Sequence, residues 1–364
     1  MAEVILKEIT KKFGNITALN KINLEIKDKD FFVIVGPSGS GKTTILRLIA
    51  GLEQPTQGEI FIDNKNVNNV LPKDRDIAMV FQNFTLYPHM NVYDNMSFGL
   101  KMKKFNKQEI DSRVRSAAEL LKITHLLYRK PKELSIGEKQ RVAIGRTIVR
   151  NPKVFLFDEP LSNLDAKLRT QMRIELKKLY EKLGSTVIYV THNQNEAMTL
   201  AKRLCVLKNG EVQQVGTQSD IFNYPSNMFV ASFIGTPPMN FFELDVIRTN
   251  ENMYFSNCNI KLTPDDTIKQ KLITYNLNKI ILGVRPENIY PVLNIETENV
   301  IESKIDFVEQ IGTEIYVYMT INKKNFIARW LNTNIQIKPG NNIRVVFDMQ
   351  KINIFHPETE QLIT

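Results

Sequence analysis

Cysteine is scarce in this sequence, with only Cys205 and Cys258 among 364 residues. Two cysteines cannot form a disulfide framework, and these two lack the paired spacing of a zinc site. We therefore expect both thiols to be reduced and structural.

Long hydrophobic runs are absent as well. Near the start, the longest purely apolar stretch is Phe31–Val35, far short of the roughly 20 residues that a membrane-spanning helix needs. The opening residues, MAEVILKEITKKF, mix acids and bases and offer neither a continuous apolar core nor a small-residue cleavage site. The sequence therefore predicts a chain that has no membrane-spanning segment or secretory signal and remains in the cytosol.

Acidic residues are in the minority, because 48 Lys and Arg against 39 Asp and Glu give a net charge of +9. The imbalance lies in residues 1–235, which hold 35 basic and 24 acidic residues, whereas residues 236–364 hold 13 and 15. A basic domain favours anionic partners such as nucleotides, nucleic acid or lipid headgroups, although the same excess is typical of a plain solvated surface.

Strand and helix patterns alternate through the first two-thirds of the chain. Apolar runs at 31–35, 153–160 and 185–192 predict buried strands, and the amphipathic segment AKLRTQMRIELKKLYEKL between the last two predicts a helix. This alternation predicts a parallel sheet in an α/β domain over residues 1–235. Between about 84 and 150 the pattern is helical without a convincing strand, which indicates a helical insert.

The last third has a different pattern. After the helical segment FNYPSNMFVASFI, the pair Pro237–Pro238 marks a break, and short β-branched strands follow with turns at Asn322–Lys323 and Pro339–Gly340. We expect residues 236–364 to form a separate small β domain.

The sequence GPSGSGKT at 36–43 fits the phosphate-binding pattern G-x-x-x-x-G-K-[ST], with the strand before it and the helix after it that this motif requires. In such a loop, backbone N–H groups surround phosphate oxygens, the lysine reaches the β- and γ-phosphates, and the threonine hydroxyl can bind Mg²⁺. An ordinary glycine turn would need neither the lysine nor the threonine. The predicted nucleotide-binding residues are Gly36, Pro37, Ser38, Gly39, Ser40, Gly41, Lys42, Thr43 and Thr44, and Thr43 is also a predicted metal ligand.

Polar side chains end the other predicted strands. Asp158 follows VFLF and is a candidate metal ligand. Glu159 beside it suits a general base that activates water. The structural alternative is that the two acids only cap the next helix. His192 ends the next strand, where a lone histidine is often structural. Gln82 follows IAMVF, where a neutral amide could bind Mg²⁺ or the attacking water.

These elements together resemble the ATP-binding subunit of an ATP-binding-cassette (ABC) transporter. The phosphate loop, VFQNFTLYPHM, the signature-like LSIGEKQRVAIGR, DEPLSNLDAKLR and TH at 191–192 occur in the family's order. The tail segments GTPPMNFF, LGVRPENI, VEQIGTEIYVYM and FHPETEQLI resemble the regulatory domain of carbohydrate-importer ATPases of the maltose and multiple-sugar type. The resemblance implies a P-loop NTPase domain of the ABC type with a helical subdomain, followed by a small all-β, OB-like (TOBE) regulatory domain.

The resemblance also implies an ATP-dependent head-to-tail dimer of two copies that share two ATP sites. Ser135 and Gly137 would bind the γ-phosphate of ATP held by the partner's phosphate loop. Asp165 would lie at the dimer seam, and Phe13 would stack on adenine, although Tyr or Trp is commoner at that position.

Further partners follow from the same resemblance. His192 would contact the γ-phosphate, and Gln82 with residues 83–95 would face two membrane-spanning permease subunits. The chain would then lie peripherally on the cytoplasmic side of the cell membrane, use ATP and Mg²⁺, and act indirectly with an extracytoplasmic solute-binding protein.

The signature departs from the family pattern, because LSIGE replaces LSGGQ at Ile136 and Glu138. A β-branched residue restricts the backbone, and Glu138 adds a negative charge near the nucleotide. We expect ATP binding to persist with a weakened trans site, so that Ile136→Gly raises steady-state hydrolysis; an unchanged rate would contradict this.

The predicted function is that of the ATP-hydrolysing, energy-coupling subunit of an importer for carbohydrates, either oligosaccharides or glycerol phosphate. Polyamine or metal uptake systems use similar subunits and remain alternatives. A soluble ATPase acting on nucleic acid or the ribosome is a further alternative, disfavoured by the single phosphate loop and by a tail without interleaved basic and aromatic residues. No nucleic-acid partner is therefore expected.

Overall fold

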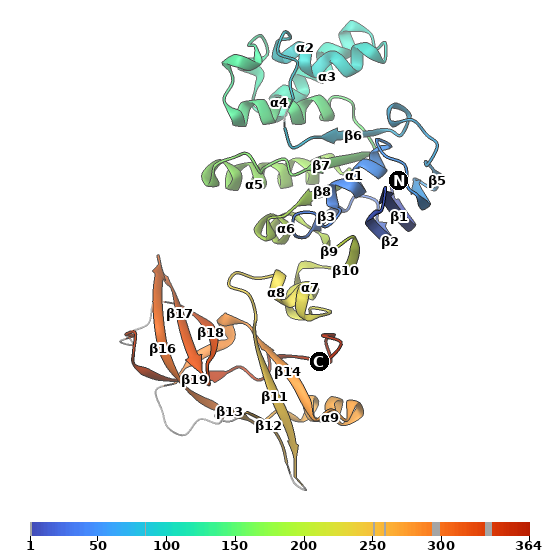
Figure 1. The fold of residues 1–364 in the computed structure, drawn as a ribbon. Coiled ribbons are helices and arrows are strands. Elements are labelled where there is room, and N and C mark those ends of the chain that lie inside the picture. Colours follow the sequence, from blue (N-terminus) through green and yellow to red (C-terminus); the bar gives the residue numbers. More distant parts are fainter. Residues whose placement is uncertain (1, 84, 250–251, 258–259, 293–298, 332–336) are drawn as a thin grey trace. The chain divides into compact units, whose positions relative to one another are not determined.

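A computed structural model describes the chain except for residues 1, 84, 250–251, 258–259, 293–298 and 332–336 (Figure 1). It divides into two compact units, Met1–Gln218 and Ser219–Thr364. Contacts therefore join residues 219–235 to the second unit, whereas the sequence analysis ends the first domain at 235. Cys205 is buried in the first unit, and burial raises the pKa of its thiol to about 12, as expected for an unreactive side chain. Cys258 lies outside the described residues.

The first unit is built around a six-stranded sheet in the order β10-β9-β3-β8-β7-β6. All neighbours are parallel except β10, which runs antiparallel to β9, so the predicted parallel sheet is confirmed. The apolar runs form its centre because every residue of β7 and β8 is buried, as expected for strands covered on both faces. The strands are β3 Phe31–Val35, β6 Ile77–Val80, β7 Val154–Asp158, β8 Thr186–Thr191, β9 Arg203–Lys208 and β10 Glu211–Gly216.

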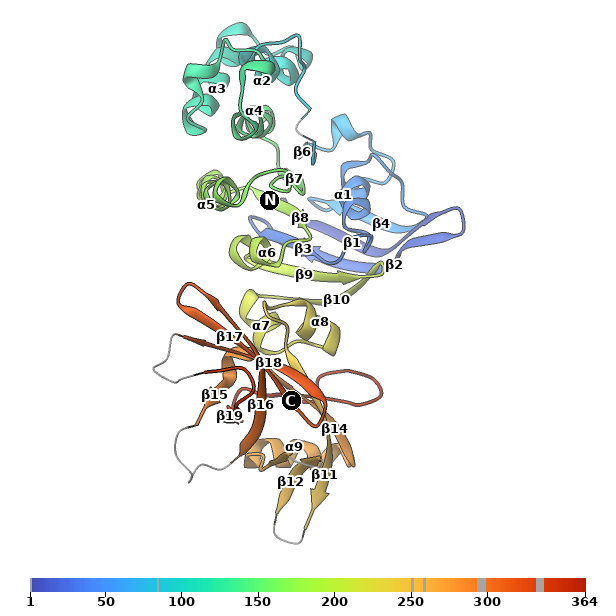
Figure 2. The ribbon, with the colours of Figure 1, turned by 60° about the vertical axis from the view of Figure 1, so that its left-hand side comes forward.

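A second, antiparallel sheet completes this unit in the order β2-β1-β4-β5. Helix α1, Lys42–Ala50, is labelled in Figure 2. Its side chains, among them Ile45 and Ile49, share one apolar core with residues of both sheets. On the parallel sheet's other face, Tyr180 of α5 packs edge-on against Phe155 and Phe157 of β7. The strands are β1 Val4–Phe13, β2 Ile16–Ile26, β4 Gln57–Ile62 and β5 Lys65–Asn66, and the helices on that face are α5 Ala166–Leu183 and α6 Gln194–Leu200.

Three helices occupy the segment that the sequence predicts to be helical: α2 Val92–Met102, α3 Lys107–Leu120 and α4 Ile136–Ile148. The described residues 85–150 contain no strand, and residue 84 lies outside the described residues. Each helix begins after a side-chain cap, since Asn91, Asn106 and Ser135 accept hydrogen bonds from backbone N–H groups of the first turn. Short 3₁₀ turns cover Pro72–Asp74, Thr124–Leu126, Pro131–Glu133 and Pro286–Asn288. In the described part of the chain, no helix combines the length and apolarity that a membrane span requires.

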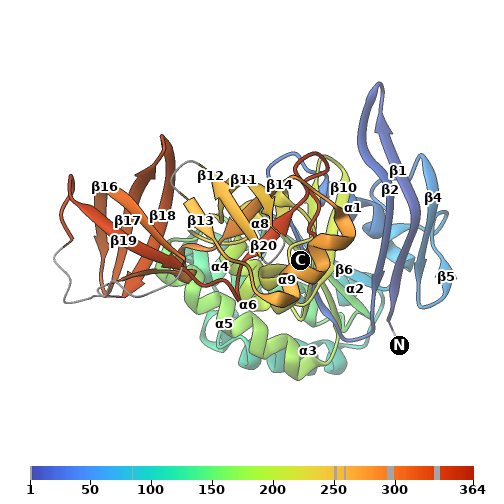
Figure 3. The same ribbon diagram turned by 90° about the horizontal axis from the view of Figure 1, so that it is seen from below.

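The second unit contains two five-stranded antiparallel sheets, in the orders β13-β12-β11-β14-β20 and β15-β19-β16-β17-β18 (Figure 3). The predicted turn at Asn322–Lys323 joins β17 to β18, and both residues have positive φ, as a two-residue hairpin requires. The strands are β11 Asn240–Arg248, β12 Met253–Asn257, β13 Ile260–Leu262, β14 Lys279–Val284, β15 Ile289–Pro291, β16 Val300–Ile311, β17 Glu314–Ile321, β18 Lys324–Leu331, β19 Asn342–Phe347 and β20 Asn353–Phe355.

Helices also belong to this unit. The short α7 Gln218–Asn223 and α8 Met228–Phe233 fall in or next to the segment predicted to be helical. Helix α9, Asp266–Tyr275, was not part of the prediction of a β domain. Its signals are local: Asp265 caps its first turn, Ile268 and Leu272 are buried one turn apart, and Asn276 ends it in the left-handed conformation.

Arg285, from the tail motif LGVRPENI, is an internal anchor of the second unit. Its side chain is 3% exposed, donates to the carbonyls of Phe222 and Ile234, and stacks on the Phe222 ring at 3.7 Å. Burial lowers its pKa to about 10, so the guanidinium remains charged at neutral pH. These contacts attach residues 222–234 to the β sheets.

Candidate functional site

The loop at 36–43 connects β3 to α1 at the carboxyl edge of the parallel sheet. Pro37, Ser38 and Gly39 are exposed, whereas Ser40 is buried, and the backbone N–H of Gly210 donates to its carbonyl at 3.0 Å. Gly41 takes the N-cap position of α1 with φ of 99°. Because glycine has no side chain with which to cap, the first N–H groups of α1 remain available to an anion.

Lys42 fills this loop from the first turn of α1, and Thr44 lies half-buried in the same turn. The Lys42 ammonium donates to the carbonyls of Gly36 and Pro37 at 2.9 and 2.7 Å. Burial lowers its pKa, partly offset by the charges of Glu159 and Asp158. The loop thus holds the Lys42 ammonium group in a position from which it could also bind a phosphate.

Thr43 and Asp158 meet across the sheet edge, because the Thr43 hydroxyl donates to Asp158 Oδ1 at 2.9 Å. Asp158 is 7% exposed, and burial raises the pKa of its carboxyl group. A hydroxyl and a carboxylate are the hard oxygen ligands that Mg²⁺ prefers, and a cation would offset the cost of ionising the buried acid. The two side chains therefore fit a magnesium site.

Replacing Asp158 by asparagine is expected to stabilise the nucleotide-free protein and to reduce ATP hydrolysis. The raised pKa means that folding penalises the ionised carboxylate, and this penalty grows as pH rises from the ordinary Asp value through the raised one. At pH 7.5 the neutral amide should therefore raise the Tm of the nucleotide-free protein by about 2 °C. ATP hydrolysis should fall about 100-fold or more, because a metal ligand is lost. Calorimetry and a phosphate-release assay test both, with exposed Asp74→Asn as the matched control; a lowered Tm would contradict the electrostatic argument.

Glu159 lies at the centre of a second cluster at the same edge. Its carboxylate Oε2 lies 3.0 Å from His192 Nδ1 and accepts from Gln82 Nε2 at 3.4 Å. The Glu159 side chain is 16% exposed and that of His192 is 53% exposed, so the cluster opens to solvent on the histidine side. The three residues come from the ends of β7, β8 and β6, as parallel strands require. Among the hydrogen bonds of the described residues, one joins the Gln82 amide to Glu159, and none joins it to the side chain of Thr43 or Asp158.

Supporting residues that the sequence analysis did not identify hold this cluster. Glu159 adopts φ of 46°, and its backbone is held by hydrogen bonds to Val190 and Ser162. Asn163 donates to the Gln82 carbonyl at 3.2 Å. Such positive φ in a non-glycine residue is costly and is typical of functional turns.

The end of β8 has its own support. Glu196 of α6 is buried and accepts from the hydroxyls of Tyr189 and Thr191 at 2.9 and 2.8 Å. The Thr191 hydroxyl in turn accepts from the Asn193 amide, which fixes the turn that carries His192. In the sequence, the signal for this support is Glu196 three residues after Asn193, the spacing of a helix N-cap and the third residue of its helix.

The remaining predicted residues lie apart from these clusters. Ser135 caps α4 and is exposed, whereas Gly137 is buried so closely that a Cβ would lie 2.9 Å from the Leu168 side chain. Asp165 is the N-cap of α5 and accepts from the Leu168 amide. Phe13 is 45% exposed at the end of β1, with the Lys11 ammonium 4.6 Å above its ring.

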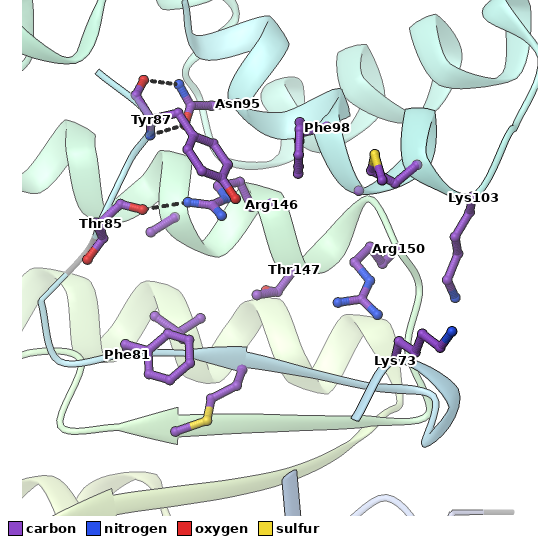
Figure 4. A pocket seen from close by; sticks show the side chains of 15 residues that line it. Lys73, Phe81, Thr85, Tyr87, Asn95, Phe98, Lys103, Arg146, Thr147 and Arg150 are labelled. Carbon is purple, nitrogen blue, oxygen red and sulfur yellow. Dashed lines mark hydrogen bonds between the residues drawn. The ribbon is translucent and has the colours of Figure 1, made fainter. Parts of the chain in front are cut away.

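A hollow of about 560 Å³ opens beside Phe81, the residue before Gln82, between β6 and the helices α2 and α4 (Figure 4). Its walls are largely apolar, with Phe81, Phe98 and Met102 among the lining residues. Arg146 of α4 donates to the Thr85 carbonyl and stacks on Tyr87, so the segment after Gln82 is attached to the helical insert. Basic side chains, Lys73, Lys103 and Arg150, also line the hollow.

A phosphate-binding loop after β3 of a parallel sheet, with two acids at the end of β7 on the far side of β8, defines a P-loop NTPase. Comparison with known families narrows this class. Residues 19–162 match the ABC transporter family model, and residues 235–289 match the MalK OB fold domain.

Similar proteins cover the whole chain. It is 49% identical to the trehalose/maltose import ATP-binding protein MalK of Thermococcus litoralis, over 100% of both chains. It is 47% identical to the oligosaccharides import ATP-binding protein MsmX of Bacillus subtilis, over 99% of both. A dimeric ATP-binding cassette solved in a post-hydrolysis state with ADP and phosphate is 38% identical, with a TM-score of 0.54 over 59% of this chain and 98% of that one. The chain belongs to the ATP-binding subunits of ABC transporters, which are ATPases coupled to transport.

Proposed function

We propose that this chain is the ATPase subunit of an importer for carbohydrates, either oligosaccharides or glycerol phosphate. The observation that supports the substrate class is full-length similarity to import proteins named for trehalose, maltose and oligosaccharides. The matching second domain supports the same class, since its family model is that of the MalK OB fold. The chain would act on the cytoplasmic side of the membrane, with a solute-binding protein selecting the ligand outside.

The residues of the phosphate loop and the Glu159 cluster suggest how hydrolysis proceeds. Lys42, released from the Gly36 and Pro37 carbonyls, would bind the β- and γ-phosphates of ATP together with the loop N–H groups. Thr43 and Asp158 would hold Mg²⁺, which supplies charge neutralisation of the phosphate oxygens.

Glu159 would act as the general base. Its carboxylate takes a proton from water as the water oxygen forms a bond to the γ-phosphorus and the bond to the bridging β,γ-oxygen breaks, leaving ADP and inorganic phosphate. His192 and Gln82 contact Glu159 Oε2 and would orient the carboxylate, the water and the γ-phosphate. The contact between Glu159 and both neighbours carries this assignment.

Completion of the site would require a second copy. The similar cassette of known structure is dimeric, which supports a dimer here. In the head-to-tail arrangement that we propose, Ser135 and Gly137 would reach the partner's γ-phosphate. Asp165 would lie near the seam, and Phe13, with one ring face next to Lys11, would stack on adenine by its other face. We also propose that residues 1–235 form the nucleotide-binding domain and residues 236–364 the regulatory domain.

The hollow beside Phe81 would receive a helix of one membrane-spanning permease subunit, because Phe81 directly precedes Gln82, the residue that contacts Glu159. Replacing Met102 there by glutamate should prevent permease binding without unfolding the protein, since this lining residue is 70% exposed. Transport should fall at least about tenfold, while hydrolysis by the isolated chain stays within about twofold. Ile174→Glu, on the exposed face of α5, is the matched control; equal loss in both variants would refute the assignment.

Affinity purification from gently solubilised host membranes tests the proposed function. Recovery of two polytopic permease subunits, identified by mass spectrometry, is expected, and competition with unlabelled sugars in an uptake assay then identifies the substrate class. Polyamine or metal competition would reject the carbohydrate assignment. Ribosomal proteins or nucleic acid in a salt-sensitive complex would instead support the soluble alternative.

A further inference from the structure

The signature residue Ser135 is already occupied within its own chain. Its backbone N–H and its hydroxyl both donate to Glu138 Oε2, at 2.7 and 2.8 Å, and the Glu138 amide donates back to Ser135 Oγ at 3.3 Å. These reciprocal bonds form a capping box at the start of α4. The Ser135 hydroxyl proton is therefore committed to a carboxylate.

This carboxylate occupies the donors that an incoming phosphate would need. A helix N-terminus attracts anions through its free N–H groups and its dipole, and carboxylate and phosphate oxygens compete for the same donors. The hydrogen bond from the Ser135 backbone lowers the pKa of Glu138, with smaller contributions from Arg129 and His125, so the group is ionised at neutral pH. A γ-phosphate that takes the Ser135 hydroxyl must displace one negative charge and then remain near it.

Ile136 does not impose a comparable obstacle within the chain. It is 54% exposed at the first position of α4, and the described structure shows a regular helix start around it. Gly137 is retained for a separate reason, since Leu168 fills the space that a side chain would need. Of the two residues that differ from the LSGGQ pattern, Glu138 is therefore the one that occupies the hydrogen-bond donors of the signature.

We propose that Glu138 is an internal competitor of ATP at the signature: its carboxylate holds Ser135 until the γ-phosphate of the partner-bound nucleotide displaces it. The inference rests on the proposed head-to-tail dimer and makes Glu138 a positioning residue that sets the ATP concentration needed for closure. Arg129 and His125, which contribute to lowering the pKa of this carboxyl group, are basic residues toward which it would turn when displaced.

The test uses the full chain carrying Glu159→Gln, so that closed dimers accumulate. The dimer fraction is measured by light scattering while Mg–ATP is increased. Glu138→Gln preserves the capping box, since glutamine serves at this position, but removes the charge. It should lower the ATP concentration at the midpoint of dimerisation about tenfold, equivalent to about 1.4 kcal/mol. ATP binding to dilute monomer should not change.

Glu133→Gln is the matched control. Glu133 caps the neighbouring 3₁₀ turn through the Lys130 amide and carries the same charge, but the hydrogen bonds of the described residues do not join it to Ser135. Its midpoint should equal that of the parent. An equal shift in both variants would overturn the inference by showing a long-range charge effect.

Two further outcomes separate the inference from the proposed function. An unchanged midpoint for Glu138→Gln, with dimers still forming, overturns the inference alone. Absence of ATP-dependent dimers in every variant overturns the dimer and the inference together. In a Ser135→Ala background the gain from Glu138→Gln should become smaller, because the competition for the serine hydroxyl is lost while the backbone N–H bond and the charge remain. Glu138→Ala, checked by its unfolding transition, replaces the glutamine variant if that variant fails to fold.

Discussion

Replacing Glu159 by glutamine is expected to reduce steady-state ATP hydrolysis by about 10²–10⁴-fold, the usual contribution of a general base. Glutamine has the same shape, so its side chain can keep the contacts with His192 and Gln82 and the backbone turn at φ of 46°. ATP binding should persist because the phosphate loop is unchanged. Closed dimers should therefore accumulate in Mg–ATP, which phosphate release and light scattering measure together.

The exposed Glu119→Gln substitution on α3 is the control for loss of a negative charge, and it should hydrolyse ATP at the parent rate. Hydrolysis by Glu159→Gln within about threefold of the parent would remove Glu159 from the role of base. Only monomer at saturating Mg–ATP would argue against the shared site.

Replacing Gly36 by alanine is expected to destabilise the first unit and weaken ATP binding together. A Cβ at this position would lie 2.1 Å from the backbone carbonyl oxygen of Leu207 in β9 and 2.8 Å from Ser40 Oγ. A backbone oxygen in a central strand cannot move aside cheaply, so we expect a loss of about 3 kcal/mol in the free energy of unfolding. The Gly36 carbonyl also holds Lys42, so the ATP dissociation constant should rise at least about tenfold.

Gly39→Ala is the matched control, because nothing lies within 4 Å of its Cβ position and only its φ of 78° opposes a side chain. That conformation costs about 1 kcal/mol. Chemical denaturation and nucleotide titration compare the two variants. Equal destabilisation would show that backbone conformation, and not the Leu207 carbonyl, decides the preference for glycine.

The sequence was sufficient to predict the parallel sheet and the edge at which the polar residues gather. Hydrophobic runs ending in Gly36, Asp158 and His192 are local signals, and parallel strands bring their carboxyl ends to one edge regardless of the loops between them. The contacts of Asp158 with Thr43 and of Glu159 with His192 follow from that topology.

Other features depend on contacts that no local pattern encodes. Glycine at 137 suggests a phosphate contact, yet Leu168 from α5 also requires it. Arg285 lies in a motif visible in the sequence, but its partners are carbonyls 63 and 51 residues away. The Ser135–Glu138 capping box was visible as S-x-x-E, but only the structure shows that the serine hydroxyl itself is bound.

ATP-driven uptake into proteoliposomes tests the central claim most directly. The vesicles would contain the two permease subunits that co-purify with this chain, with the solute-binding protein outside and Mg–ATP inside with the chain. Accumulation of a labelled oligosaccharide or glycerol phosphate with the parent chain, and its loss with Glu159→Gln, is the predicted result. Equal uptake with both chains, or none with any of these ligands although ATP is hydrolysed, would contradict the account.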